Sequence, residues 1–163
     1  MGCTALHWRR IVNWDAYFDG ILEAVRVKSQ DTSSKYGAVV ADRQNRILAT
    51  GYNGLPRGIR YREEYHKRPD KYMYFVHAEQ NAIFNAAAFG TPVRGAIIYV
   101  VHPPCVECTK AIIQAGIQEV IFREHQPEFS QLELNHDNWR LTLEASAEML
   151  NEAGVSLRRA VKT

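Results

Sequence analysis

One stretch of the chain, from Phe75 to Cys108, most constrains the fold, because it carries a histidine and two cysteines at the spacing of a metal site. It begins Phe-Val-His-Ala-Glu and ends Pro-Pro-Cys-Val-Glu-Cys. The imidazole of His77 and the thiolates of Cys105 and Cys108 would bring a zinc dication to about zero net charge. Three protein ligands leave the fourth tetrahedral position for water, so the pattern predicts a catalytic zinc site rather than a structural one.

The spacing of these residues fits two helix N-termini. Cys105 and Cys108 are three residues apart, so on a helix both sulfurs fall on one face. His77 and Glu79 are two residues apart, which would point them in different directions in mid-helix. We therefore expect them in the first turn of a helix that runs to about Ala87. The partial positive charge of both N-termini would favour thiolate, hydroxide and carboxylate groups.

Glu79 is the carboxylate beside this ligand set, and we expect it to transfer protons. A zinc ion lowers the pKa of a bound water from about 15.7 towards roughly 7. A carboxylate outside the coordination sphere can take a proton from that water and deliver protons to a substrate. The alternative is a closed zinc knuckle or a set of unrelated core residues. A knuckle needs a fourth ligand, and Glu79, between a histidine and an apolar helix, fits that role poorly.

Length and composition indicate one globular domain. The chain has 163 residues, 46% of them hydrophobic, which is near the common domain size, so we expect a single domain over residues 1–163. The N-terminus has no apolar run of the kind that signal peptides carry. No stretch approaches the roughly 20 apolar residues of a membrane span. Two of the three cysteines are assigned to the metal, which fits a reducing compartment, and we expect the protein in the cytoplasm.

The order of the predicted elements indicates an α/β fold. The predicted strands are residues 36–41, 47–52, 96–101, 119–122 and 155–158. The predicted helices are residues 14–28, about 77–87, about 104–115 and 139–150. The first two strands form a hairpin, and the later strand-helix-strand unit forms a parallel right-handed crossover. We expect a three-layer α-β-α sandwich with a mixed five-stranded sheet, and the metal at the carboxyl ends of strands. Residues 123–137 show no pattern.

Residues 54–74 are predicted to form a long loop. Six basic and three acidic residues lie between Gly54 and Lys71, which gives the loop a net charge of +3. A loop of this length without structure of its own is uncommon in a compact domain unless it serves function. The positive charge, just before the metal-binding helix, suits a phosphorylated substrate. The alternative is a solvated surface loop.

From Trp14 to about Val161 the chain resembles the deoxycytidylate (dCMP) deaminases, a branch of the cytidine deaminase superfamily. His-Ala-Glu followed by Pro-Cys-x-x-Cys marks the superfamily. Two runs narrow the resemblance to this branch, Gly-Tyr-Asn-Gly-Leu-Pro-Arg-Gly at 51–58 and Ile-Ile-Gln-Ala-Gly-Ile at 112–117. The resemblance implies a cytidine deaminase-like fold and a zinc-dependent hydrolysis that converts dCMP to dUMP and ammonia, a step of pyrimidine deoxynucleotide metabolism.

The resemblance also implies roles for individual residues. The zinc ligands would be His77, Cys105 and Cys108. Glu79 would be the proton shuttle, Asn53 matches a residue that hydrogen-bonds the sugar, and the backbone around Ala78 would receive the base. Arg57 and Lys28 are the candidates for further substrate contacts. The equal alternative for each is an ordinary surface charge. Relatives of this kind are commonly homo-oligomers regulated by dCTP and dTTP, so the resemblance implies a homo-oligomer here and makes dCTP and dTTP candidate effectors.

Other functions stay open at this point. One is a deaminase of 5-substituted dCMP or of another cytosine or adenine substrate, including tRNA adenosine. Binding to nucleic acid needs a basic stripe, whereas residues 119–152 hold eight acidic and two basic residues, so no nucleic acid is expected as partner, and no membrane either. Another is a non-catalytic nucleotide-binding relative, which would not need Glu79.

Overall fold

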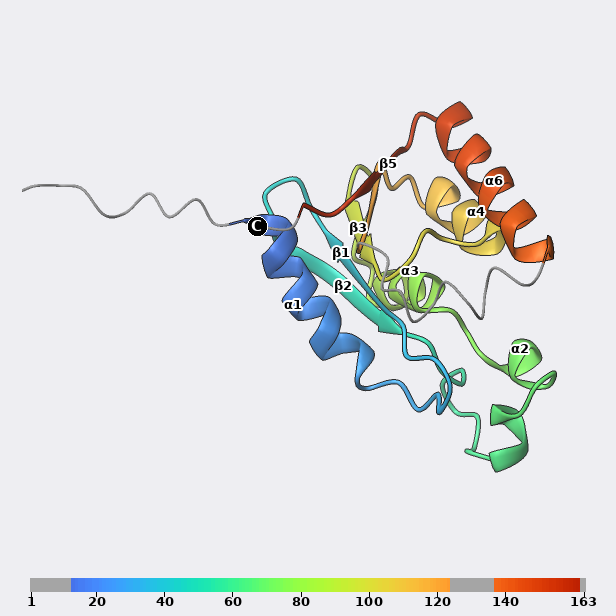
Figure 1. Cartoon of the computed structure of the whole chain (residues 1–163). Coiled ribbons are helices and arrows are strands. Elements are labelled where there is room, and N and C mark those ends of the chain that lie inside the picture. The colour runs from blue at the N-terminus through green and yellow to red at the C-terminus, as the bar shows by residue number, and fades with distance from the viewer. Residues whose placement is uncertain (1–12, 124–136, 162–163) are drawn as a thin grey trace, which may run out of the picture.

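A mixed five-stranded sheet lies at the centre of the computed structural model, which describes residues 13–123 and 137–161 (Figure 1). The strands are β1 (Gly37–Ala41), β2 (Ile47–Tyr52), β3 (Ile97–Val100), β4 (Glu119–Phe122) and β5 (Ser156–Arg159). Their order in the sheet is β2-β1-β3-β4-β5. β1 pairs antiparallel with β2 and β3, whereas β3, β4 and β5 run parallel. The prediction of a mixed five-stranded sheet is confirmed.

Helices cover both faces of this sheet and so give three layers. The helices are α1 (Trp14–Arg26) on one face, and α3 (Ala78–Ala88), α4 (Val106–Gln114) and α6 (Asp137–Glu152) on the other. Successive residues of a strand point to opposite faces. Val39 therefore packs in a cluster with Phe18 of α1, while Ala38 and Val40 pack in the cluster beneath the other helices. The predicted three-layer α-β-α sandwich is confirmed.

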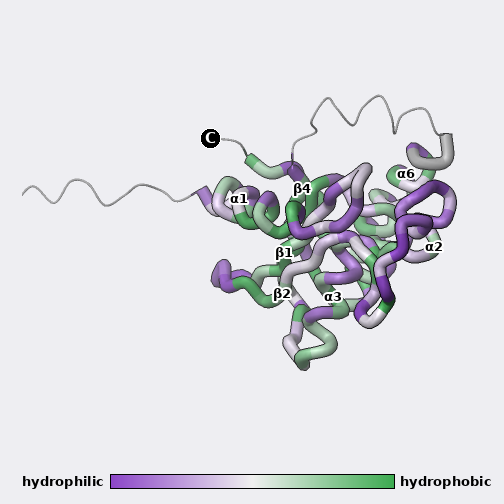
Figure 2. The backbone as a smooth tube through the Cα atoms, turned by 90° about the horizontal axis from the view of Figure 1, so that it is seen from below, coloured by the Kyte–Doolittle hydropathy of each residue, from purple (hydrophilic) through white to green (hydrophobic). Residues whose placement is uncertain are grey.

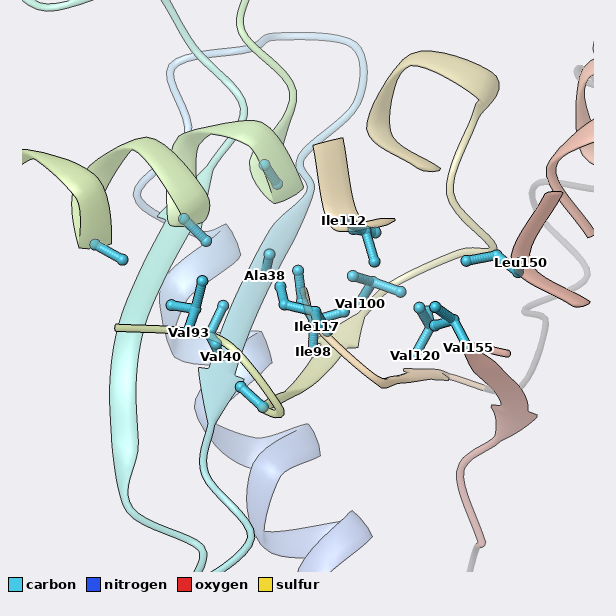
Figure 3. Close-up of a cluster of buried hydrophobic side chains, with 14 residues drawn as sticks. Ala38, Val40, Val93, Ile98, Val100, Ile112, Ile117, Val120, Leu150 and Val155 are labelled. Atoms are coloured by element: carbon cyan, nitrogen blue, oxygen red, sulfur yellow. The ribbon is translucent and has the colours of Figure 1, made fainter. Parts of the chain in front are cut away.

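The larger core cluster lies between the sheet and helices α3, α4 and α6, as Figure 3 shows. Its fully buried members from the strands include Val40, Ile98 and Val120, and helix α4 contributes Ile112. β-branched side chains suit a strand that is covered on both faces. Burying one such side chain stabilises the fold by about 1.5–3 kcal/mol. This cluster holds the helices that begin at the metal-site motifs against the sheet.

Helix α3 approaches β2 closely because only small residues lie between them. The buried face of the helix consists of Ala78, Ala82 and Ala86. A Cβ atom on Gly51 would lie 2.2 Å from the backbone nitrogen of Ala82 and 2.4 Å from the carbonyl oxygen of Ala78. Only glycine fits at this close approach of two backbones. The contact fixes the N-terminus of α3, where the His-Ala-Glu motif lies.

Ion pairs join α1 to the strands at the β5 edge of the sheet. Nη1 of Arg158 lies 2.7 Å from Oδ2 of Asp15 in α1, and its Nε lies 2.9 Å from Oε1 of Glu119 in β4. Asp15 is buried and also accepts a hydrogen bond from the backbone N–H of Val161. The hydrogen bond from Arg158, with that from Val161, holds the pKa of Asp15 below its ordinary value of 3.8.

The segment 54–74 is more ordered than a plain loop. It contains a 3-10 turn, η1 (Glu63–His66), and a short helix, α2 (Lys71–Tyr74), where the sequence predicted no element. Aromatic rings hold the two turns together, because Tyr65 stacks on Tyr74 with ring centroids 3.9 Å apart. Figure 2 shows that the residues around α2 are largely hydrophilic. Single aromatic residues in a charged segment give no periodic signal, so these turns could not be predicted from the sequence.

Residues 124–136, most of the stretch without a pattern, lie outside the described residues. No helix in the described part of the chain is both long enough and apolar enough to cross a membrane.

Candidate active site

His77, Cys105 and Cys108 come together at one point. Nδ1 of His77 lies 3.4 Å from Sγ of Cys105 and 3.3 Å from Sγ of Cys108, and the three ligand atoms lie within 4.8 Å of one another. Tetrahedral zinc with nitrogen and sulfur bonds of about 2.1 and 2.3 Å separates these atoms by roughly 3.6 Å. The positions and the nitrogen-sulfur-sulfur donor set therefore fit zinc.

No fourth ligand joins this group among the described residues. In that part of the chain, no other histidine, cysteine, aspartate or glutamate places a ligand atom within the cluster. Glu79, two residues after His77, is therefore not one of the clustered ligands. A set of three protein ligands is the arrangement of catalytic zinc sites, which leave one position for water or substrate.

Two helix N-termini bring these residues together. His77 is the N-cap of α3, and Cys105 is the N-cap of α4, each with extended backbone angles. The backbone N–H groups of Asn81 and Thr109 donate back to the carbonyl oxygens of His77 and Cys105, respectively, and so close the first turn of each helix. The prediction placed His77 inside the first turn, whereas it lies one residue before it. The positive ends of both helices still face the sulfurs.

Contacts within the ligand group shift the pKa values of its members in different directions. The hydrogen bond from Cys108, with a further one from His77, lowers the pKa of Cys105 to about 4. The pKa of Cys108 is raised, because its thiol donates that bond to Cys105 and is buried. The hydrogen bond to Cys105 raises the pKa of His77 against the opposing effect of burial. A zinc ion would displace these protons, because metal ligands bind in their deprotonated forms.

Glu79 lies in the first turn of α3 and lines the cavity next to the ligand group. Burial raises the pKa of its carboxyl above the ordinary value of 4.5, although the charge of His77 partly opposes the shift. A carboxyl group with a raised pKa holds a proton more readily than an ordinary glutamate, which suits a group that must both accept and return one. The arrangement can therefore support acid-base chemistry at the metal.

The ligand group opens into a cavity of about 530 Å³, a size typical of small-molecule sites. The wall includes Ala78 at the start of α3, Asn53 just after β2, and Val101 and His102 just after β3. This is the carboxyl end of β3, which is where the sequence predicted the site. Open α/β sheets bind ligands at such edges.

Asn53 lines the cavity, but protein groups already occupy both hydrogens of its side-chain amide. Its Nδ2 donates to Oδ2 of Asp31 at 2.9 Å and to the carbonyl oxygen of Ser34 at 2.8 Å. Its Oδ1 accepts from the backbone N–H of Tyr36 at 2.8 Å. One lone pair of Oδ1 is left for a sugar hydroxyl. The amide therefore joins the loop after α1 to the cavity wall, and its contact with a sugar stays a prediction.

Asp31 and Lys71 form a buried ion pair in the same wall, which sequence reasoning missed. Nζ of Lys71 lies 2.6 Å from Oδ2 of Asp31 and 2.7 Å from Oγ of Ser33. Burial by itself would raise the pKa of Asp31, but the hydrogen bonds from Lys71 and from the backbone of Ser33 and Ser34 outweigh it and lower the pKa. The pair joins residues 40 positions apart, so no local spacing could indicate it.

Arg57 and Lys28, the candidates for further substrate contacts, do not line this cavity. The guanidinium of Arg57 donates to Oδ1 of Asn85 in α3 and lies 5.9 Å from the ring centroid of Phe89. Lys28 is exposed and follows the end of α1. The cationic residues of segment 54–74 that do line the cavity are Arg68 and Lys71.

Comparison with known proteins agrees with the geometry. Residues 12–124 match the family described as the cytidine and deoxycytidylate deaminase zinc-binding region. Deoxycytidylate deaminase of Homo sapiens is 37% identical over 154 residues, which cover 91% of this chain and 80% of that protein. A probable deoxycytidylate deaminase of Drosophila melanogaster is 35% identical, covering 93% of this chain and 74% of its own.

A solved structure has the same architecture. The dCMP deaminase of the cyanophage S-TIM5, in its apo form, superposes with a TM-score of 0.66 and 25% identity over 89% of this chain and 95% of that one. The family match spans the motifs that supply the histidine, the glutamate and both cysteines of the site. The chain therefore belongs to the cytidine and deoxycytidylate deaminase family of zinc-binding enzymes.

Proposed function

We propose that this chain is a zinc-dependent dCMP deaminase, which converts dCMP and water to dUMP and ammonia. The observation that carries the proposal is the carboxylate of Glu79, which lines a cavity beside a three-ligand metal group. The named activity of the human and fly relatives supports dCMP as the substrate.

His77, Cys105 and Cys108 would hold the zinc ion through Nδ1 and two thiolates. When bound, zinc would make a water molecule easier to deprotonate at neutral pH, because it lowers the pKa of water from about 15.7 to roughly 7. The site's own residues then have two tasks, which are to move protons and to hold the cytosine ring against the attacking oxygen.

Glu79 carries the protons. Its carboxylate takes a proton from water as the water oxygen forms a bond to C4 of the cytosine ring, and it delivers that proton to ring atom N3. Glu79 then moves the second proton from the added oxygen to the amino nitrogen on C4. The C4–N bond breaks, ammonia leaves and the C4 carbonyl of uracil forms. Because burial raises the pKa of Glu79, the same group can serve in both directions.

The substrate contacts are part of the proposal. Ala78 opens α3 and lines the cavity, and backbone N–H groups in the first turn of a helix have no partner within the helix. We assign the backbone around Ala78 to the base and the remaining lone pair of Asn53 Oδ1 to a sugar hydroxyl.

The resemblance to the family also supports proposals for the domain extent, the oligomeric state, the location and the regulation of the enzyme. We infer one deaminase domain over residues 1–163, a homo-oligomer in the cytoplasm, and regulation by dCTP and dTTP. Light scattering after gel filtration would measure the oligomer, and titration with dCTP and dTTP would show whether either nucleotide changes the rate. A monomer that neither nucleotide affects would contradict this part.

The activity is tested with the purified, zinc-loaded protein. Separate incubations with dCMP, CMP, 5-methyl-dCMP, dCTP and cytidine, each followed by ammonia release, should give the highest kcat/KM with dCMP or its 5-methyl form. Treatment with 1,10-phenanthroline should abolish the activity, and added Zn²⁺ should restore it. The non-chelating isomer 1,7-phenanthroline is the control. Turnover of free cytidine without turnover of dCMP would refute the proposal.

A further inference from the structure

We propose that Arg68 binds the phosphate of the nucleotide in the active-site cavity, and that this contact makes the enzyme prefer a nucleoside monophosphate to a nucleoside. The inference rests on the proposed function for the identity of the substrate. It assigns the phosphate contact to a residue that no sequence motif pointed to.

Most of the basic residues between Gly54 and Lys71 lie outside the cavity lining. Of the six, only Arg68 and Lys71 line it. The guanidinium of Arg62 lies over the ring of Tyr65, 5.5 Å from its centroid. Nζ of Lys67 lies 3.5 Å from a carboxylate oxygen of Glu63 on the surface. Segment 54–74 therefore presents only two cationic side chains, Arg68 and Lys71, to the cavity.

The charge of Lys71 is already compensated. Its ammonium lies 2.6 Å from Oδ2 of Asp31, and both side chains are buried. The other oxygen of Asp31, Oδ1, accepts from the backbone N–H groups of Ser33 and Ser34 and from the hydroxyl of Ser33. A phosphate dianion approaching this wall would meet a neutral pair. Lys71 can orient a phosphate through a remaining N–H, but it does not supply net charge.

Arg68 is the cation that remains. Within residues 13–123 and 137–161, Arg68 forms no ion pair with a carboxylate, in contrast to Arg43, Arg123 and Arg158. Its guanidinium lies 5.7 Å from the ring centroid of Tyr72, which also lines the cavity. Contact with an aromatic face orients the planar guanidinium and leaves its N–H edge free to donate.

The chemistry of that edge suits a phosphate. A guanidinium presents paired N–H donors that match two phosphate oxygens, and such charge-assisted pairs are stronger and more specific than those of an ammonium. The carboxylates that line the described cavity are Asp31, which is saturated, and Glu79, which lies at the metal group. Neither neutralises Arg68, so its full charge is available to the ligand. A nucleoside, which has no phosphate, gains no binding free energy from Arg68.

The test compares Arg68→Gln and Arg68→Lys with Arg62→Gln, a matched control on the same segment whose side chain does not line the cavity. For Arg68→Gln, the ratio of kcat/KM for dCMP to that for deoxycytidine should fall roughly 10- to 100-fold, the value of a hydrogen bond to a charged group. The loss should lie mainly in KM. Arg68→Lys should recover part of the ratio, and Arg62→Gln should leave it unchanged.

Binding of the product provides a readout that does not depend on turnover. Calorimetry should show that Arg68→Gln weakens the binding of dUMP by roughly 10- to 100-fold but hardly changes the binding of deoxyuridine. The zinc content and the thermal midpoint of the variant should equal those of the unaltered chain. Equal losses for nucleotide and nucleoside, or no loss for either, would overturn the assignment. An unaltered chain that binds dUMP through Arg68 but deaminates neither substrate would keep the phosphate site and refute the proposed activity.

Discussion

Nζ of Lys71 lies 2.6 Å from Oδ2 of Asp31, and the two side chains are 10% and 1% exposed. The pair connects helix α2 to the loop that follows α1, and Asp31 in turn holds Asn53 in the cavity wall. Three segments distant in the sequence thus depend on one carboxylate. Removing either charge would leave the other buried.

Replacing Lys71 by Met should destabilise the fold by about 3 kcal/mol, because the partner carboxylate of a broken buried pair keeps its desolvation cost. Lys67→Met is the matched control, since it removes an exposed pair with Glu63 on the neighbouring turn and should change the free energy of unfolding by less than about 1 kcal/mol. Urea unfolding monitored by circular dichroism measures both. Equal effects of the two substitutions would mean that the buried pair adds no special stability.

The ion pair of Asp15 with Arg158 should make the stability depend on pH in acid. The folded-state pKa of Asp15 is below its ordinary value of 3.8, so the folded state binds this proton less readily than the unfolded state does. The contribution is fully present above about pH 4 and is lost as the pH falls through the lower folded-state pKa. Asp15→Asn should therefore be less stable than the unaltered chain at pH 7, and the difference should shrink as the pH falls below about 4.

Urea unfolding of both chains at a series of pH values measures this difference. Because loss of zinc in acid affects both chains alike, it cancels in the comparison. A difference that stays constant from neutral to acid pH would show that Asp15 titrates alike in the folded and unfolded states.

Glu79→Gln should remove catalysis without removing the metal. The amide cannot carry protons between water and the ring, so kcat for dCMP should fall roughly 100- to 10,000-fold, while zinc content stays at that of the unaltered chain. Glu107→Gln is the control, because Glu107 is an exposed acid in the first turn of α4 that pairs with Lys110. Retention of most of the activity by Glu79→Gln would exclude the assigned role.

Gly51→Ala should weaken the metal site, although Gly51 is not one of its ligands. Its new Cβ would lie 2.2 Å from a backbone atom of α3, so the helix must shift. The shift should lower the free energy of unfolding by about 3 kcal/mol. It should also weaken zinc binding, because His77 and Glu79 move with the helix. Gly20→Ala is the control: a Cβ at Gly20 meets nothing within 4 Å. In the middle of α1 it should stabilise the chain by about 0.5–1 kcal/mol. Thermal unfolding and a zinc competition assay compare the two. Unchanged zinc affinity in Gly51→Ala would show that the first turn of α3 does not depend on this contact.

The metal ligands could be predicted from the sequence because their geometry is local. Cys105 and Cys108 lie one helical turn apart, and the histidine and glutamate lie at the start of the next helix back along the chain, so spacing alone brings each half of the site together. The sheet could be predicted for the same kind of reason, because alternating and continuous apolar runs mark strands whatever their partners are.

The cavity wall could not be predicted in this way. Which of Arg57, Arg68 and Lys71 faces the substrate depends on how segment 54–74 folds back on the domain, and that is fixed by contacts such as the pairing of Lys71 with Asp31. The amide of Asn53 is committed to Asp31 and Ser34 for the same reason. Charge and motif show that such residues exist, whereas long-range contacts decide which way they point.

The backbone contact between Gly51 and the first turns of α3 has a further consequence. Main chain lies directly on main chain there, with no side chain in between, so no rotamer change can make room at this point. A side chain at position 51 can therefore be accommodated only by moving the helix, whereas exchanges among the valines and isoleucines of the sheet can be absorbed by neighbouring side chains.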